Sequence, residues 1–253
     1  MPDTDAITFV LTSCGRFDLL ASTLERFLAH NTAPIARYIV IEDSGDSSVD
    51  QVVGRFEQPI EPIVNQTRLG QMASIDRAYA TIDTPYIFHC EDDWRFFRGD
   101  FIEQSRVLLD GDPSISTVLC RRAGQNPYHD QIYASEPRSL AGISYYKAPV
   151  WGVRDWLGYS FNPGLRRRAD ITRLGSFAAL GHELEASLYF KHQGMSVACL
   201  ADPACETTGT LRRLSKDATP RRLRGTLRFC AARLRFYLTP VGARVPPPRD
   251  GGR

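Results

Sequence analysis

The chain has 253 residues, 43% of them hydrophobic, so it can bury a sizeable core as one large domain or two fused lobes. We expect one compact unit. No stretch approaches the roughly 20 apolar residues of a membrane span, and no secretory signal pattern opens the sequence. The six cysteines form no CxxC pair, which favours a reducing compartment. These features predict a cytoplasmic protein.

The formal net charge of +2 is unevenly distributed along the chain. Residues 212–253 contain twelve Arg or Lys and two Asp, a net charge of +10, so the preceding part is acidic. We expect one folded domain over residues 1–210, with halves 1–95 and 96–210, and a basic extension over 211–253. The leucines and aromatic residues of this extension either pack on the acidic body or dock peripherally at an anionic membrane surface, such as the inner membrane.

The first half of the chain alternates predicted strands and helices. The predicted strands cover residues 7–12, 37–41 and 62–64 and a segment that starts at Tyr86. Apolar residues recur at helical spacing from Phe17 to about His30, and again from Ile75 to Ile82. This order predicts an α/β fold with a largely parallel, Rossmann-type central sheet flanked by helices.

The second half has a less regular pattern. A helix with Phe101, Leu108 and Leu109 on one side precedes a strand at 116–120, and an irregular stretch then extends to about Leu165. A further helix opens at residues 181–183 and ends near Gly194, before a strand at 197–200. Long irregular segments in a compact domain usually bind a ligand.

Three consecutive acids, Glu91, Asp92 and Asp93, follow the apolar start of the Tyr86 strand. Like charges this close repel one another and raise each other's pKa unless a cation neutralises them. The cluster therefore predicts either a divalent metal or a strong basic partner. Oxygen ligands favour Mg²⁺ or Mn²⁺ over Zn²⁺. A solvated acidic turn is the alternative, which the bulky residues after Asp93 disfavour.

Polar residues also end the first two strands, at 12–16 and at 42–46. In parallel sheets ligands bind at the carboxyl ends of the strands. We therefore expect these two segments and the three acids to converge on a nucleotide site.

Two features of the second half are open to a functional or a structural interpretation. Trp151, Trp156, Tyr159 and Phe161 either pack against a sugar or base, or form the core of the second half. Glu183 stands in a first helical turn, where a carboxylate is also a common helix cap worth ~0.3–1 kcal/mol.

Residues 7 to about 209 resemble the inverting nucleotide-sugar glycosyltransferases of the GT-A type, in particular the large family 2. The order of four motifs carries the resemblance: the turn at 12–16, an acid at Asp43, the turn at 65–70 and an acidic metal motif at 91–93. The resemblance implies a GT-A-like fold and transfer of a sugar from a nucleotide diphosphate sugar to a hydroxyl of a glycan, lipid-linked or other acceptor.

The resemblance also implies roles for single residues. Asp93, with Glu91, would bind Mn²⁺ or Mg²⁺. The donor would be bound by Thr12, Ser13, Gly15, Arg16, Asp43, Asn65, Arg68, Gly70, Glu91 and Asp92. Glu183, eleven residues before Gly194, matches the place of the catalytic base, although the family has Asp there. The acceptor would be bound by Trp151, Trp156, Asn162 and His182.

The sequence departs from the family at one further place. Many members carry a late His-x-Gly whose imidazole reaches the metal, and this chain has Thr207-Thr208-Gly209 instead. Either Thr207 or water would fill that coordination position of the metal, or this protein uses the metal less strongly than is usual in the family.

Other functions remain open alternatives: a non-catalytic sugar- or nucleotide-binding module derived from a transferase, or another metal-dependent nucleotide enzyme such as a nucleotidyltransferase. The turn at 13–16 has one glycine and no lysine, unlike a Gly-rich, lysine-bearing phosphate loop, which disfavours the nucleotidyltransferase. The arginine-rich extension has no nucleic-acid reading motif, so we expect no nucleic-acid partner.

Overall fold

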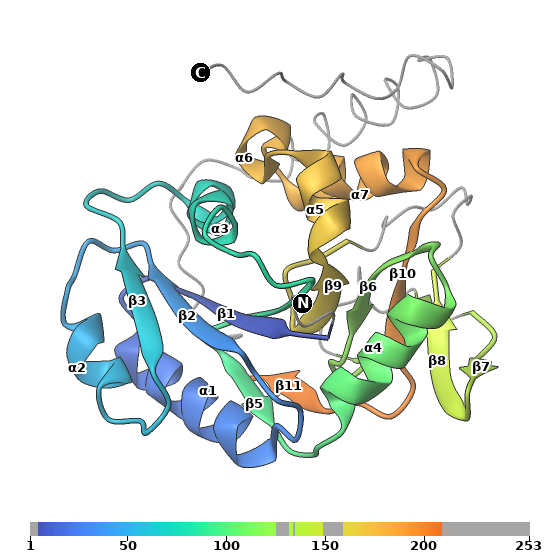
Figure 1. Cartoon of the computed structure of the whole chain (residues 1–253), viewed down its shortest axis with the longest axis horizontal. Helices are drawn as coiled ribbons and strands as arrows, with labels where there is room; N and C mark the ends of the chain where they lie inside the picture. Colours follow the sequence, from blue (N-terminus) through green and yellow to red (C-terminus); the bar gives the residue numbers. More distant parts are fainter. Residues whose placement is uncertain (1–4, 125–131, 134, 149–158, 209–253) are drawn as a thin grey trace.

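A computed structural model describes residues 5–124, 132–133, 135–148 and 159–208 (Figure 1). The predictions made for Trp151, Trp156 and the basic extension concern residues outside these ranges. None of the helices in the described ranges is long and apolar enough to cross a membrane.

The helices and strands follow one another along the chain in mixed order. They are β1 (Ile7–Ser13), α1 (Phe17–His30), β2 (Arg37–Glu42), α2 (Val49–Val53), β3 (Ile60–Val64), α3 (Gln71–Tyr79), β4 (Tyr86–Glu91), β5 (Trp94–Phe96), α4 (Phe101–Gly111), β6 (Ile115–Leu119), β7 (Arg138–Leu140), β8 (Ile143–Lys147), β9 (Gly164–Arg167), α5 (Arg168–Leu174), α6 (Phe177–Leu180), α7 (Glu183–His192), β10 (Ser196–Leu200) and β11 (Cys205–Thr207).

One sheet runs through both halves of the chain, in the order β3-β2-β1-β4-β9-β6-β10-β8-β7. β3, β2, β1 and β4 are parallel neighbours, whereas β9 runs antiparallel between β4 and β6. The register pairs Ser13 with Glu42 and Thr12 with Glu91, so the carboxyl ends of β1, β2 and β4 meet at one edge. The predicted α/β fold is confirmed.

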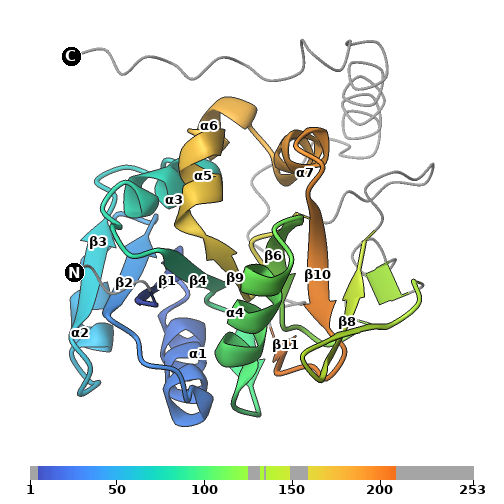
Figure 2. The ribbon, with the colours of Figure 1, turned by 45° about the vertical axis from the view of Figure 1, so that its right-hand side comes forward.

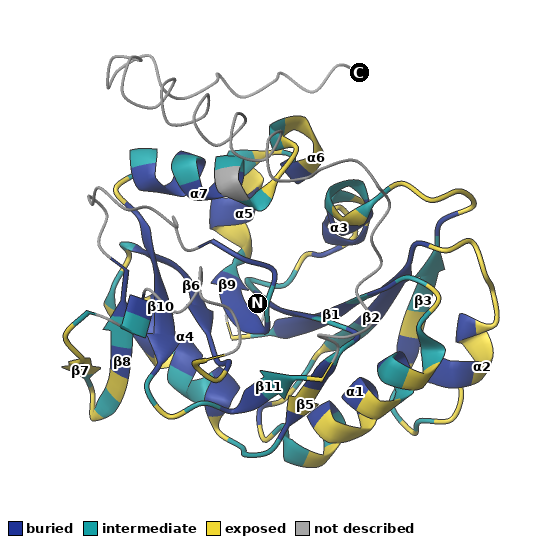
Figure 3. Ribbon diagram, turned by 180° about the vertical axis from the view of Figure 1, so that it is seen from behind, coloured by how far each residue is buried: buried dark blue, intermediate teal, exposed yellow. Residues whose placement is uncertain are grey.

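Helices cover both faces of the sheet (Figures 1 and 2). α1, α2 and α4 lie on one face, and α3, α5, α6 and α7 lie on the other. Because successive side chains of a strand point to opposite faces, Phe9 packs with the α1 side and Val10 with the α3 side. Figure 3 shows central strands such as β1 and β10 buried between these layers, while β7, β8 and the outward sides of α1 and α2 carry exposed residues.

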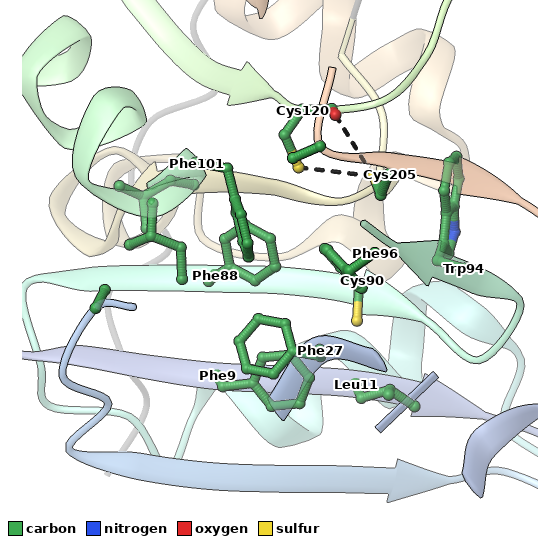
Figure 4. Close-up of a cluster of buried hydrophobic side chains, with 14 of the residues drawn as sticks. Phe9, Leu11, Phe27, Phe88, Cys90, Trp94, Phe96, Phe101, Cys120 and Cys205 are labelled. Atoms are coloured by element: carbon green, nitrogen blue, oxygen red, sulfur yellow. Dashed lines mark hydrogen bonds between the residues drawn. The ribbon is translucent and has the colours of Figure 1, made fainter. Parts of the chain in front are cut away.

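Aromatic rings fill the core on the α1 side of the sheet (Figure 4). The ring of Phe27 stacks on Phe9 at a centroid distance of 4.0 Å and meets the edge of Phe96 at 5.3 Å. At the far end of this core the Sγ atoms of Cys120 and Cys205 are 3.7 Å apart, both as free thiols. Full burial of a phenylalanine side chain stabilises the fold by ~1.5–3 kcal/mol relative to leaving it exposed.

A short ribbon returns the chain to the acidic motif after β10. β11 pairs antiparallel with β5, and this register sets Thr207 opposite Trp94. The amide of Thr208 donates a hydrogen bond to the Asp93 carbonyl at 2.8 Å. The last described residues therefore lie beside the acids of residues 91–93.

The structure corrects one prediction for the second half. The stretch expected to be irregular contains β7, β8 and the start of β9, all of them strands of the main sheet. β9 begins with Gly164 and includes Arg166 and Arg167, so it lacks the apolar run that predicts a central strand. Its conformation comes from its neighbours β4 and β6, because strand formation depends strongly on cross-strand context.

Candidate functional site

The candidate site lies at the carboxyl ends of β1, β2 and β4. Thr12 and Ser13 end β1, and Glu91 ends β4 beside them. The turn after β1 bends sharply at Gly15, whose φ of +69° favours glycine. Glu42 Oε1 accepts hydrogen bonds from the amides of Gly15, at 2.9 Å, and Ser44, at 2.7 Å. This buried carboxylate, to which sequence analysis gave no role, holds the two turns together.

Arg16 is the basic partner of the acidic motif. Its Nε donates to Asp92 Oδ2 and its Nη1 to Asp93 Oδ2, each at 3.1 Å, and its Nη2 pairs with Asp92 Oδ1. Ser13 Oγ adds a longer bond to Asp92 at 3.3 Å. Burial raises the pKa of Asp92 to about 6, although the charge of Arg16 opposes the rise. Arg16, expected to bind the donor, thus also neutralises part of the motif.

Glu91 points to the other side of the motif. Its carboxylate accepts hydrogen bonds from Gln71 Nε2 at 2.9 Å and from Trp94 Nε1 and Asn162 Nδ2 at 3.3 Å each. Burial raises the pKa of Glu91 to about 8, and the negative charges of Asp93 and Glu183 add to the rise. A bound cation would relieve this repulsion.

Asp43 anchors the turn that leads into α3. Its Oδ1 accepts from Asn65 Nδ2 at 2.8 Å and from the Leu69 amide at 2.7 Å, and its Oδ2 accepts from the Gly70 amide at 2.8 Å. Arg68 lies 4.0 Å from the same carboxylate. Gly70 has a φ of +89°, a conformation that other residues rarely adopt. Two predicted donor-binding residues, Asn65 and Gly70, therefore hydrogen-bond to Asp43, and a third, Arg68, forms a long ion pair with it.

Glu183 begins α7 and faces this edge of the sheet. Its Oε1 accepts a hydrogen bond from the Phe161 amide at 2.8 Å and a longer one from Ser160 Oγ at 3.3 Å. These bonds fix the carboxylate on the loop before β9, which argues against the simple helix cap considered from sequence. Burial raises the pKa of Glu183, and the Phe161 amide partly opposes this. Asn162, the residue after Phe161, donates to Glu91, so the segment that holds Glu183 also contacts the acidic motif.

Solved structures of similar fold give this geometry a context. A mannosyltransferase from Pyrobaculum calidifontis in complex with GDP-Man and Mn²⁺ matches with a TM-score of 0.61 at 12% identity, over 92% of this chain and 70% of its own. S. aureus TarS 1–349 in complex with UDP matches with a TM-score of 0.59 at 12% identity, over 94% and 68%. The fold is that of the GT-A glycosyltransferases.

GalNAc-T7 with UDP, GalNAc and Mn²⁺ also shares this GT-A fold, with a TM-score of 0.59 at 11% identity, over 91% of this chain and 50% of its own. No family model matches the sequence, and no curated protein sequence is similar to it. The structural likeness therefore concerns the fold, and the roles of single residues depend on the chemistry of this site.

The acceptor-side residues expected from the sequence fall in different places. Asn162 lies in the site, where it donates to Glu91, and His182 is exposed just before Glu183. Tyr159 and Phe161 are completely buried, so the core interpretation holds for these two rings. Trp151 and Trp156 lie outside the described residues.

The carboxylates of the acidic motif suit a divalent ion that is also bound by the phosphates of a substrate. Within the described residues, no three His, Cys, Asp or Glu side chains converge to hold a metal. Asp93 and Glu91 nevertheless supply carboxylate oxygens whose mutual repulsion raises the pKa of Glu91. Mg²⁺ is usually bound by one or two carboxylates together with substrate phosphates, not by a complete protein cage. The residues present fit that type of site.

Replacement of Asp43 by alanine is expected to weaken nucleoside diphosphate binding ~10–100-fold and to change kcat much less, because the resemblance implies that Asp43 contacts the base, remote from the bond that breaks. The loss of three hydrogen bonds should also lower stability by ~1–3 kcal/mol. Calorimetric Kd values and steady-state kinetics measure the two effects. Asp46→Ala, in the same segment but fully exposed, is the control. A selective fall in kcat at unchanged affinity would contradict this role of Asp43.

Proposed function

We propose that the protein is a metal-dependent, inverting glycosyltransferase that moves a sugar from a nucleotide diphosphate sugar to a hydroxyl of a glycan, lipid-linked or other acceptor. One observation carries the proposal. The Glu183 carboxylate at the start of α7 accepts a hydrogen bond from the Phe161 amide, and the next residue, Asn162, donates to Glu91 of the acidic motif that ends β4. Glycosyl transfer needs such an arrangement, with an acid group on the acceptor side and a cation site on the donor side.

The proposed reaction breaks the bond between the anomeric carbon and the diphosphate. Negative charge grows on the leaving oxygen while the acceptor hydroxyl loses its proton and attacks from the opposite face. Glu183 would accept this proton as the general base, since burial raises its pKa toward the range in which a base is effective near neutrality. Attack from the opposite face inverts the anomeric centre.

The donor side would use the residues at the ends of β1, β2 and β4. Asp93 and Glu91 would hold Mn²⁺ or Mg²⁺, which offsets charge on the diphosphate when it is bound. Arg16, already paired with Asp92 and Asp93, would place a second positive charge beside the leaving group. The Asp43 unit, with Asn65, Arg68 and Gly70, would form the wall of the pocket for the base. Ser13 and the Gly15 turn would close its floor.

A non-catalytic nucleotide-binding module is the second candidate. The position of Thr207 beside Trp94 favours it, because threonine stands where the resemblance implies a metal-binding histidine. Hydrolysis of the donor, measured with and without Mn²⁺, distinguishes the two, since only an enzyme turns the donor over.

A thermal-shift screen against UDP, GDP, dTDP and CMP with Mn²⁺ or Mg²⁺ tests the donor class. A ligand at 100 times its Kd stabilises by ~2.7 kcal/mol, which for a domain of this size raises Tm by about 5–10 °C. We expect such a shift for at least one nucleoside diphosphate, and a much smaller one after the ion is chelated. No shift with any nucleotide in either ion would rule out the proposed donor.

A further inference from the structure

Arg166 is a buried charge in the middle of the sheet. It lies on β9 opposite Ile87 of β4, and its side chain is fully buried on the face covered by α3 and α7. Its Nη1 donates to the hydroxyls of Tyr79 at 3.3 Å and Tyr159 at 3.4 Å. No carboxylate in the described part of the chain forms an ion pair with it, and its Nε and Nη2 have no hydrogen-bond partner there.

Among the described residues, the groups around the Arg166 guanidinium carry no full negative charge to offset the cost of its burial. Removing a charge from water is costly, and two aromatic hydroxyls without a full negative charge compensate only part of that cost. Replacement of buried charged groups by apolar residues of similar volume is often neutral or stabilising. The position of Arg166 therefore calls for an explanation other than stability.

The guanidinium supports the segment that binds Glu183. It lies over the rings of Tyr159, at 5.6 Å, and Phe161, at 5.4 Å, one on each side of Ser160. The Phe161 amide and Ser160 Oγ are the two groups that hold Glu183 Oε1. Arg166 thus orders both residues that flank Ser160, and through them the Glu183 carboxylate.

A second contact joins the same segment to α7. The Tyr159 amide donates to Ser187 Oγ at 3.0 Å, and Ser187 Oγ donates to the Glu183 carbonyl at 2.9 Å. Hydrogen bonds therefore link the first turn of α7 to the loop before β9.

The network also reaches the donor side. Tyr79 shares a hydrogen bond of 3.0 Å with His89 Nδ1, and His89 precedes Glu91 by two residues on the same face of β4. Through Tyr79, Arg166 is thus linked to β4, the strand that carries Glu91. Through Tyr159, it is linked to the loop whose groups hydrogen-bond to Glu183.

From these contacts we propose that Arg166 is a positioning residue, which fixes the Glu183 carboxylate opposite the acidic motif through the Tyr159–Phe161 segment. This inference rests on the proposed function, in which Glu183 is the general base. The positive charge of Arg166 also opposes part of the rise in the pKa of Glu183 that burial causes, which favours the ionised form that a general base needs.

The test replaces Arg166 by methionine, which has a similar length and no charge, and by lysine, which keeps the charge but has no planar group to stack. The probe is hydrolysis or transfer of the sugar linked to whichever of UDP, GDP or dTDP gives the largest thermal shift. We expect Arg166→Met to lower kcat ~10–100-fold, with the Kd of the nucleoside diphosphate unchanged and Tm equal or higher. Arg166→Lys should recover part of the rate.

The same two substitutions in a Glu183→Gln background separate positioning from a general structural effect. If Arg166 acts through Glu183, the double variants should be no slower than Glu183→Gln alone, because coupled residues are not additive. Arg168→Met, the same change at an exposed position of α5, is the control and should leave kcat unaltered. Should Arg166→Met fail to fold, Arg166→Lys carries the test alone.

Two outcomes would overturn the proposal. One is a parental kcat in both Arg166 variants. The other is an equal fall in kcat when Arg166 is replaced in the parent and in the Glu183→Gln variant. A parental rate in Glu183→Gln itself would instead contradict the proposed base. The failure of one hypothesis can thus be distinguished from the failure of the other.

Discussion

Replacement of Glu183 by glutamine should lower the rate of sugar transfer by ~10²–10⁴-fold, the usual contribution of a general base. Glutamine has the same shape, and its Oε1 can still accept the hydrogen bond from the Phe161 amide. The site should therefore remain folded, and the affinity for the nucleoside diphosphate should be preserved. Steady-state kinetics with a fixed acceptor, combined with calorimetry of nucleotide binding, measure both quantities.

The pH profile gives this prediction a second readout. A general base acts only in its ionised form, so the rate should rise with pH as Glu183 loses its proton. Because burial raises the pKa of Glu183, this rise should lie above the ordinary range of a glutamate. The Glu183→Gln variant should lack the rise.

Glu185→Gln is the matched control, since it makes the same change two residues further along α7. Equal losses in the two variants would mean that the base is misassigned or that α7 is disturbed as a whole. No loss in Glu183→Gln would remove Glu183 from the mechanism.

The gathering of polar residues at the carboxyl ends of β1, β2 and β4 could be predicted from the sequence because each of its parts is local. Apolar runs lead directly into polar residues at Ser13, Asp43 and Glu91, and parallel strands bring such ends to one edge. The acidic motif also indicated the need for a cation or a basic partner. The sequence could not decide between them, because Arg16 lies 76 residues from Asp92 in the chain.

The surroundings of Glu183 were harder to predict because their contacts join distant segments that have no clear periodicity. The bond from the Phe161 amide to Glu183 depends on the course of a loop, which no residue pattern specifies. β9 was missed for a related reason. Its Arg166 is a charged residue where a central strand usually has an apolar one, and only the paired strands β4 and β6 show that it is buried.

Asp93→Asn should abolish turnover and remove the dependence of nucleotide binding on a divalent ion. The change deletes one negative charge and one hard oxygen ligand, and asparagine is a much weaker ligand for Mn²⁺ or Mg²⁺. The fold should tolerate it. Arg16 keeps its bonds to Asp92, and Glu91 loses one of the charges that raise its pKa, so the pKa of Glu91 should fall toward its ordinary value.

Thermal shifts with a nucleoside diphosphate, recorded with Mn²⁺ and with a chelator, test this prediction beside the activity assay. The parent should show a large shift only with the ion, whereas Asp93→Asn should show the same small shift in both buffers. Asp50→Asn, an exposed change on α2, should behave like the parent. If Asp93→Asn kept full activity in chelator-treated buffer, Asp93 would not be a metal ligand, and Arg16 would be the cation that serves the diphosphate.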